Sequence, residues 1–199
     1  MTRSGTGYQT ALCNELQKSK IDLAGISEAR IPGPGSSRVQ GSLLLHSGGA
    51  HRQHGVALVI SPQLVNSLQS WSPISDRLLQ SRFSHKHGHL TVVVVYAPTE
   101  IADDDTKDSF YHQFSAAIAT VPPHDILVIL GDLNAVTGPP TDSSSIVGPF
   151  GSGMPNDNTE RLLSLCAVHG LTVMGSWFRR RDIHRWTWLS HDGTTKKGD

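Results

Sequence analysis

DILVILGDLNAVTG, residues 125–138, joins an apolar run to a group of polar residues and decides the predicted fold. Five apolar residues, Ile126 to Leu130, predict a buried β-strand. Gly131 then leads into Asp132 and Asn134, which place a carboxylate and a carboxamide just beyond that strand. Because Gly, Asp and Asn are also the usual residues of turns, a chain reversal and a functional site explain this stretch equally well.

Two other predicted strands also end in a polar side chain. IDLAGISE, residues 21–28, ends at Glu28, and TVVVVY, residues 91–96, ends at Tyr96. In open α/β sheets, ligands bind at strand ends, because the sheet holds the first groups rigidly while the loops beyond can vary. We therefore expect Glu28 and Tyr96 to meet the polar residues that follow the strand at 126–130.

Carboxylate and carboxamide oxygens of this kind are hard ligands that suit Mg²⁺. A magnesium site typically uses one or two carboxylates together with waters and phosphate oxygens of the substrate. In phosphoester hydrolysis the metal shields the phosphate charge, a carboxylate aligns or deprotonates the attacking water, and a phenol or amide stabilises the charged oxygens. The residue types at these strand ends therefore predict phosphoester chemistry.

Helical and strand-like segments are interleaved along the chain, with hairpins among them. Apolar residues recur at helical spacing in some segments and form β-branched or alternating runs in others. A mixed-sheet α/β layered domain therefore fits better than a purely parallel one. The predicted helices contain Tyr8 to Leu16, Phe110 to Val121 and residues 158–169; further predicted strands are 42–47, 55–61, 171–178 and 184–190, with 30–38 as a loop.

The composition indicates one domain without general affinity for polyanions. The chain has 199 residues, and Lys plus Arg equal Asp plus Glu at 17 each, so any polyanion must be bound locally. Cys13 and Cys166 each lie in an apolar periodic segment, which predicts buried free thiols and a reducing compartment. No apolar run is long enough for a membrane span, and the amino terminus lacks the apolar core of a signal peptide. We therefore expect an intracellular protein, nuclear or cytoplasmic, without membrane contacts.

Four motifs in order, DLAGISEAR, GVALVIS, VVVYAPTE and LGDLNAVTG, resemble the endonuclease/exonuclease/phosphatase superfamily. The segments LQSWSPISDRLLQSRF, DDDTKDSFYHQF, FGSGMPNDNTERLLSLC and HRWTWLSHDG are similar to the endonuclease domains of non-LTR retrotransposons and to the craniofacial development protein 2 group. The resemblance implies an α/β fold: a four-layer α/β sandwich with two mixed β-sheets flanked by helices. It covers nearly all of a single domain, residues 1–199.

The resemblance also implies a role for each residue that matches a family motif. Glu28 matches the glutamate that binds the catalytic Mg²⁺, for which Mn²⁺ is a possible substitute, and Arg30 matches a basic residue that binds substrate. Tyr96 matches the tyrosine that contacts the scissile phosphate. Asp132 matches the aspartate that positions or deprotonates the attacking water. Asn134 matches the asparagine that hydrogen-bonds that water or the phosphate.

The implied function is a Mg²⁺-dependent phosphodiesterase, a DNA-nicking endonuclease of retroelement origin that contacts the DNA phosphate backbone. The resemblance further implies an asparagine on a strand before Tyr8, and an aspartate followed by an Asp-His pair in the last strands. No residue matches these by position, so we expect an incomplete domain, truncated at both ends, with weak or absent activity. A sugar or inositol phosphate phosphatase and a catalytically inert binding module are the alternatives.

Several other motifs have two interpretations. His85, His87 and His89 could bind Zn²⁺, but Gly88 and the lack of a fourth ligand favour a solvated hairpin turn. We interpret His54, ahead of Gly55, as an ordinary loop histidine.

Charged and aromatic runs leave similar alternatives. Asp103 to Asp105 precede a helix and favour its positive end rather than a cation. The basic run RRRDIHR, residues 179–185, could contact DNA phosphates or form a solvated loop. Trp186 and Trp188 alternate with Thr187, which favours core packing over stacking on a base. We expect Asn158 to cap the helix that follows it.

Overall fold

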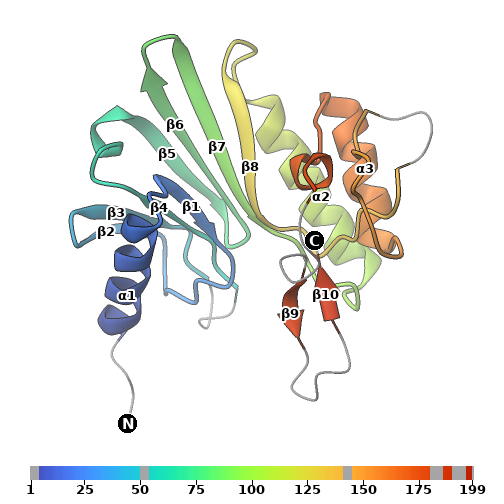
Figure 1. The fold of residues 1–199 in the computed structure, drawn as a ribbon, viewed down its shortest axis with the longest axis horizontal. Helices are drawn as coiled ribbons and strands as arrows, with labels where there is room; N and C mark the ends of the chain where they lie inside the picture. Colours follow the sequence, from blue (N-terminus) through green and yellow to red (C-terminus); the bar gives the residue numbers. More distant parts are fainter. Residues whose placement is uncertain (1–4, 50–53, 141–144, 180–185, 190–195, 199) are drawn as a thin grey trace. The chain divides into compact units, whose positions relative to one another are not determined.

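The computed structural model describes residues 5–49, 54–140, 145–179, 186–189 and 196–198 (Figure 1). The chain divides into two compact units, which are described separately. The first unit contains residues 1–96 and 120–132, and the second contains residues 97–119 and 133–199. The expectation of a single domain stays a prediction.

The first unit contains a four-stranded antiparallel sheet with the strand order β1-β4-β3-β2. The pairing of β3 with β4 confirms the hairpin expected from residues 42–47 and 55–61. Residues 35–38, expected as part of a loop, instead belong to β2, because the chain from Gly35 to Val39 pairs with β3. The strands are β1 (Leu23–Ile26), β2 (Gly35–Val39), β3 (Ser42–His46) and β4 (Ala57–Ile60).

A second four-stranded sheet of the same unit has the order β5-β6-β7-β8. Its first three strands are antiparallel neighbours, whereas β7 and β8 run parallel, so this sheet is mixed as predicted and the first is not. Strands β5 and β6 were not predicted from the sequence. The elements are η2 (Val65–Ser67), β5 (Leu68–Ser75), β6 (Leu78–His85), β7 (Gly88–Tyr96) and β8 (Ile126–Asp132).

The two sheets pack face to face around an apolar core. Alternate residues of each strand point into it, as a pleated strand with one face on the core requires. The core residues are Leu45, Val56, Leu58 and Ile60 from the first sheet and its loops, and Leu79, Phe83, Val92, Val94 and Tyr96 from the second. Figure 1 shows the sheets as neighbouring layers of this unit. The predicted α/β sandwich with two sheets is confirmed.

Helix α1 (Gly5–Lys18) covers the other face of the first sheet. Cys13 of this helix packs with Leu44, Ala57 and Val59, whose side chains point away from the core between the sheets. Cys13 and Cys166 are both buried free cysteines, as predicted.

Strand β8 lies at an edge of the second sheet, and this position corrects the expectation of a fully buried strand. Ile126 is 58% exposed and Val128 is 37% exposed. An edge strand has a neighbour on one side only, so its outer residues bury less surface than those of the central strand β7.

The second unit contains two helices, α2 (Asp104–Ala119) and α3 (Asp157–His169), that pack against each other. The hydroxyl of Tyr111 donates to the carbonyl of Asn158 at 3.0 Å, and Ser115 contacts His169 at 2.8 Å. Helix α2 ends before Val121, which was expected on its apolar face, because Pro122 disfavours the helical conformation of the residue before it. None of the described helices is both long and apolar enough to cross a membrane.

The expected strand at 171–178 is wrong. Met174–Trp177 forms the 3-10 helix η3, and Val173 makes only an isolated bridge to Val147. The N–H and hydroxyl of Ser176 both donate to the carbonyl of Val173, at 3.1 and 2.6 Å, and this local bonding replaces a strand ladder. The strand expected at 184–190 corresponds to β9 (Trp186–Leu189), which pairs with β10 (Lys196–Gly198).

Candidate active site

The carboxyl ends of β7 and β8 bring two expected site residues side by side. Val95 lies opposite Gly131, and Tyr96 lies opposite Asp132. Gly131 has a φ of 130°, and a Cβ at this position would lie 1.9 Å from the carbonyl oxygen of Val95. Only glycine fits such a position. The glycine of LGDLN is therefore what keeps the two strands paired as far as Asp132.

The end of β1 approaches the same strand ends. A Cβ at Gly25 would lie 2.8 Å from Cβ of Leu130, so the missing side chain permits this close approach. Ser27, just beyond β1, accepts a hydrogen bond from the N–H of Asp132 at 3.1 Å and donates to the carbonyl of Val95 at 3.4 Å. The single hydroxyl of Ser27 thus joins three strand ends at the residue before Glu28.

Glu28 accepts hydrogen bonds on both carboxylate oxygens. The hydroxyl of Tyr96 donates to Oε1 at 2.8 Å, and the guanidinium of Arg30 donates to Oε2 at 2.7 Å. The hydrogen bond from Tyr96, and next that from Arg30, lower the pKa of Glu28 below its usual value. The side chains of Glu28 and Arg30 are 47% and 68% exposed, so their ion pair adds little stability and the carboxylate stays accessible to solvent.

Tyr96 is held in its protonated form. Burial, and next the hydrogen bond to Glu28, raise the pKa of Tyr96 to about 12. A phenol with this pKa carries its proton at neutral pH, so Tyr96 acts as a hydrogen-bond donor there.

Arg77 and His54 flank Tyr96; His54 was expected to be an ordinary loop histidine, and Arg77 had no expected role. Arg77 donates to the carbonyl of Tyr96 at 3.1 Å, and its guanidinium carbon lies 5.1 Å from the centre of the Tyr96 ring. Its other nitrogen lies 3.3 Å from Nε2 of His54, whose ring centre is 6.1 Å from that of Tyr96. Because an arginine can only donate, Nε2 of His54 is the acceptor. Neither residue ends a predicted strand, so only the tertiary structure places them beside Tyr96.

Asn134 belongs to the second unit and has a φ of 48°. Its side-chain nitrogen donates to the carbonyl of Ala97 at 2.9 Å, and its own carbonyl accepts from the side chain of Asn156 at 2.8 Å. The structure thus gathers Glu28, Arg30, Tyr96 and Asp132 within the first unit, and places Asn134 two residues further along the chain.

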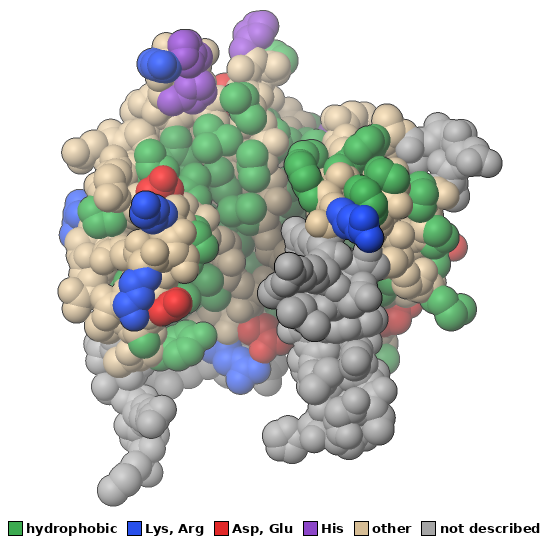
Figure 2. Space-filling model, in the orientation of Figure 1, with side chains coloured by type: hydrophobic (Ala, Val, Ile, Leu, Met, Phe, Trp, Pro, Cys, Tyr) green, Lys and Arg blue, Asp and Glu red, His purple; other side chains and the backbone are tan. Residues whose placement is uncertain are grey.

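The histidines at 85, 87 and 89 lie far from Tyr96. His85 pairs with Gly88 across a tight β6–β7 turn, which confirms the predicted hairpin. Strand β7, which has nine residues, runs from this turn to Tyr96, a length of about 25 Å. Figure 2 shows histidine side chains at that end of the second sheet. In the part of the chain that the structure describes, no three His, Cys, Asp or Glu side chains group as a metal site.

Two helix starts clarify the remaining motifs. Oδ1 of Asp103 accepts from the N–H of Thr106 at 2.7 Å, which confirms that this acidic run serves the start of α2. Asn156, not Asn158, caps α3, because its side chain accepts from the N–H of Thr159. Residues 180–185 of the basic run and the side chains of Trp186 and Trp188 lie outside the described part of the structure.

Comparisons with known proteins support the resemblance. No protein-family model matches the chain. The chain is 32% identical over 180 residues, 90% of its length, to craniofacial development protein 2 of Bos taurus and, over the same length, to that of Tragulus javanicus. These segments amount to 30% and 31% of the two relatives, so the chain spans about a third of their length.

Among solved structures, the chain is similar to the endonuclease domain of TRAS1, a telomere-specific non-LTR retrotransposon. The TM-score is 0.60 and the sequence identity 16%, over 95% of this chain and 74% of that domain. At this identity the likeness establishes the fold: the chain has the α/β-sandwich fold of that endonuclease domain. The expected resemblance to retrotransposon endonucleases and to craniofacial development protein 2 is confirmed.

Proposed function

We propose that the chain is a divalent-metal-dependent phosphodiesterase, and that it nicks DNA as an endonuclease of retroelement origin. The observation that carries the proposal is the meeting of three strand ends. The carboxylate of Glu28, the hydroxyl of Tyr96 and the register position of Asp132 come together where β1, β7 and β8 end. This is the edge of an α/β sheet at which ligands bind.

The residues fit Mg²⁺ better than Zn²⁺. Glu28 supplies an ionised, half-exposed carboxylate, and each of its oxygens has room for a second interaction beside the hydrogen bond it accepts. A magnesium site needs only one or two carboxylates, whereas zinc takes three or four nitrogen, sulfur or carboxylate ligands. A bound Mg²⁺, or Mn²⁺ in its place, would shield the negative charge of the scissile phosphate.

The other residues supply the remaining chemistry. Asp132 positions or deprotonates the attacking water. Tyr96, which stays protonated, donates to a phosphate oxygen, and Asn134 hydrogen-bonds the water or the phosphate. Arg30, largely exposed beside Glu28, binds a phosphate of the substrate. Since the chain has zero net charge, such local cations are what would hold the polyanion.

Conversion of supercoiled plasmid to nicked circles, with MgCl₂ and with EDTA, tests the proposal. The chain is assayed beside a form extended at both ends, because it spans about a third of the length of the curated relatives it matches. Asp132→Ala is the active-site variant, and Asp105→Ala, an exposed acid of α2, is the matched control. We expect nicking that needs Mg²⁺, survives Asp105→Ala and falls by at least about 1,000-fold in Asp132→Ala.

Other outcomes contradict the proposal in distinct ways. If folded forms of both lengths leave the plasmid intact but release phosphate from an inositol phosphate, the chain is a phosphatase. If they hydrolyse neither substrate, the chain is an inert binding module. Nicking that persists in Asp132→Ala would show that the cluster at the ends of β7 and β8 is not the active site.

A further inference from the structure

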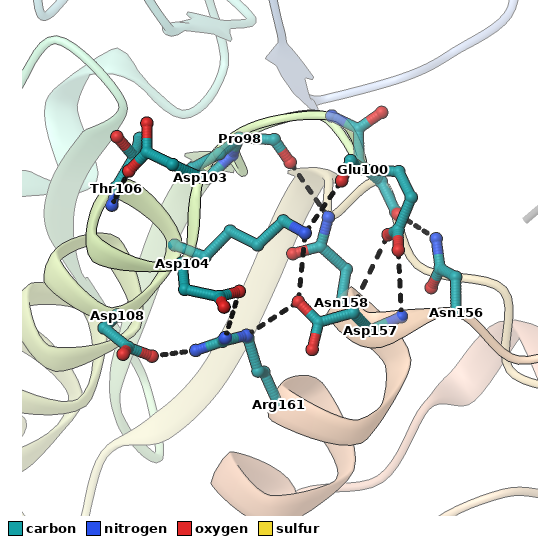
Figure 3. Close-up of polar contacts among 12 residues, drawn as sticks. Pro98, Glu100, Asp103, Asp104, Thr106, Asp108, Asn156, Asp157, Asn158 and Arg161 are labelled. Carbon is teal, nitrogen blue, oxygen red and sulfur yellow. Dashed lines mark hydrogen bonds and ion pairs between the residues drawn. The ribbon is translucent and has the colours of Figure 1, made fainter.

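The first turn of α3 holds two separate loops of the second unit. One loop, residues 97–103, follows β7, and the other, residues 133–136, carries Asn134. Asn156 and Asn158 both reach out from the start of α3 to backbone carbonyls of these loops. Figure 3 shows their side chains together with Pro98 and Glu100.

Asn156 uses both ends of its carboxamide. Oδ1 accepts from the N–H of Thr159 at 3.0 Å and so caps the helix, while Nδ2 donates to the carbonyl of Asn134 at 2.8 Å. Thr159 completes the contact, because its hydroxyl donates to the carbonyl of Val136 at 2.6 Å and accepts from the N–H of the same residue at 3.0 Å. The capping residues of α3 therefore also hydrogen-bond the backbone of the loop at Asn134 and at Val136.

Asn158 anchors the other loop. It is fully buried, and its Nδ2 donates to the carbonyl of Pro98 at 2.9 Å, while its Oδ1 has no hydrogen-bond partner. A buried amide oxygen without a partner costs about 1–3 kcal/mol. The bond to the carbonyl of Pro98 is therefore the contact through which this buried asparagine holds the loop. Asn134 then joins the two loops through its bond to the carbonyl of Ala97.

Charged groups hold the same loop to the helix. The carboxylate of Glu100 accepts from the N–H of Asp157 at 3.1 Å and from that of Asn158 at 3.5 Å. The buried ammonium of Lys107 donates to the carbonyl of Glu100 at 2.8 Å and pairs with Asp157 at 3.0 Å. The loop after β7 is thus bound to the first turn of α3 by its backbone and by a side chain (Figure 3).

We propose that Asn156 and Asn158 are positioning residues for Asn134, and that the first turn of α3 sets the geometry of its carboxamide. Asn156 binds the backbone carbonyl of Asn134. Asn158 binds the carbonyl of Pro98, which follows Ala97, the residue whose carbonyl accepts from the side chain of Asn134. The catalytic part of this inference rests on the proposed function. The positioning part rests on the hydrogen bonds alone, so it is measured without activity.

Asn156→Asp separates positioning from helix stability. Aspartate is as good an N-cap as asparagine and keeps the acceptor for Thr159, but it replaces the donor to Asn134 by an oxygen. Asn158→Leu removes the donor to Pro98 while keeping the site apolar and of similar size. Asp103→Ala is the control, because it removes the cap of α2, and Asp103 is not part of the hydrogen bonds that join Asn134 to Ala97 and Asn156.

The first readout is the side-chain amide signal of Asn134 in ¹⁵N NMR spectra, assigned by its absence from Asn134→Ala. We expect hydrogen exchange of this amide to accelerate by about fivefold to tenfold in Asn156→Asp and Asn158→Leu, and to be unchanged in Asp103→Ala. A variant that unfolds is replaced by Asn156→Ser, which also caps the helix. An Asn134 signal unaltered in folded variants would overturn the proposal.

The second readout is plasmid nicking by the form that shows activity. We expect kcat to fall by about 100-fold in Asn156→Asp, with KM changed by less than about threefold, because a misplaced group weakens the transition state more than substrate binding. A normal kcat beside a disturbed Asn134 signal would overturn the catalytic role. If no form nicks DNA, the proposed function fails, while the NMR result still decides whether α3 positions Asn134.

Discussion

The hydroxyl of Tyr96 donates a hydrogen bond of 2.8 Å to Oε1 of Glu28, a residue 68 positions earlier in the chain. The bond joins the loop after β1 to the end of β7. It exists because Gly25 lets β1 approach the second sheet closely. It also couples two ionisable groups, since it lowers the pKa of Glu28 and raises that of Tyr96.

Replacing Tyr96 by phenylalanine should raise the pKa of Glu28. The hydrogen bond from Tyr96 is the largest cause of the low pKa of Glu28, and phenylalanine keeps the ring but lacks the donor. A ¹³C NMR titration of the Glu28 carboxyl measures the change, with Tyr8→Phe on the exposed face of α1 as control. An unchanged titration of Glu28 would contradict the coupling.

Burial of Tyr96, together with this hydrogen bond, predicts how Tyr96 affects stability at high pH. Its pKa in the folded chain, about 12, lies above the value of about 10 for an unfolded tyrosine. A group with a raised folded pKa stabilises the protein below its unfolded pKa, and this contribution is lost as the pH rises towards the folded value. Between about pH 10 and 12, the wild-type chain should therefore lose more stability than Tyr96→Phe in urea unfolding. Parallel losses in the two proteins would contradict this.

Gly131→Ala should destabilise the chain by about 3 kcal/mol or more. A Cβ there would overlap the carbonyl oxygen of Val95, and alanine disfavours a φ of 130°. The control is Gly7→Ala in α1, where a Cβ meets nothing within 4 Å. This control should keep or raise stability, by up to about 1 kcal/mol. Urea unfolding measures the stability of both variants. Equal stabilities would refute the pairing of β7 with β8 at this position.

Asp125→Asn should reduce stability at neutral pH and make it less sensitive to acid. Arg82 donates to both oxygens of Asp125, at 2.6 and 2.9 Å, and Thr91 donates at 2.8 Å. The hydrogen bonds from Arg82 lower the pKa of Asp125 to about 2.

Because its folded pKa is depressed, Asp125 stabilises the chain above its unfolded pKa of about 4, and the contribution is lost as the pH falls towards about 2. Thermal unfolding between these pH values compares wild type with Asp125→Asn, and Asp105→Asn serves as the exposed control. A wild-type Tm that falls no faster with acid than that of Asp125→Asn would contradict the prediction.

The two cysteines should resist thiol reagents while the chain is folded. Burial raises the pKa of Cys13, and it raises the pKa of Cys166 to about 11. Only the thiolate reacts, so Cys166 at pH 8 should react with Ellman's reagent about 100-fold more slowly than in the unfolded chain. Cys13→Ser isolates the signal of Cys166. Fast reaction of the folded variant would contradict the burial of Cys166 in α3.

Local patterns in the sequence predicted the elements that carry the site. The β-branched run to Tyr96 and the apolar run to Leu130 form β7 and β8; β7 ends at Tyr96 as predicted, whereas β8 continues past Leu130 to Asp132. Prediction failed where a local hydrogen bond competes with a strand, as at Ser176, and where a strand has no strong pattern, as in β5. These failures arise because pairing with a distant partner decides whether such segments extend.

The partners of the site residues could not be predicted in the same way. Arg77 stands in the turn before β6 and His54 in a loop, and neither position has a periodic signal. Each reaches Tyr96 only because sheet pairing brings its segment there. Asn158 shows the same limit, since it was expected to cap α3, whereas the fold assigns the cap to Asn156 and bonds Asn158 to the carbonyl of Pro98.

Side-chain period, β-branching, glycine and proline act over a few residues, so the sequence alone predicts the helices, the strands that carry the site and the polar groups near the ends of those strands. Which of these ends meet depends on the fold. Register pairing set Tyr96 opposite Asp132, and the absent side chain of Gly25 admitted β1 and brought Glu28 to the hydroxyl of Tyr96. Such contacts depend on burial and backbone pairing between distant segments, which no local pattern encodes.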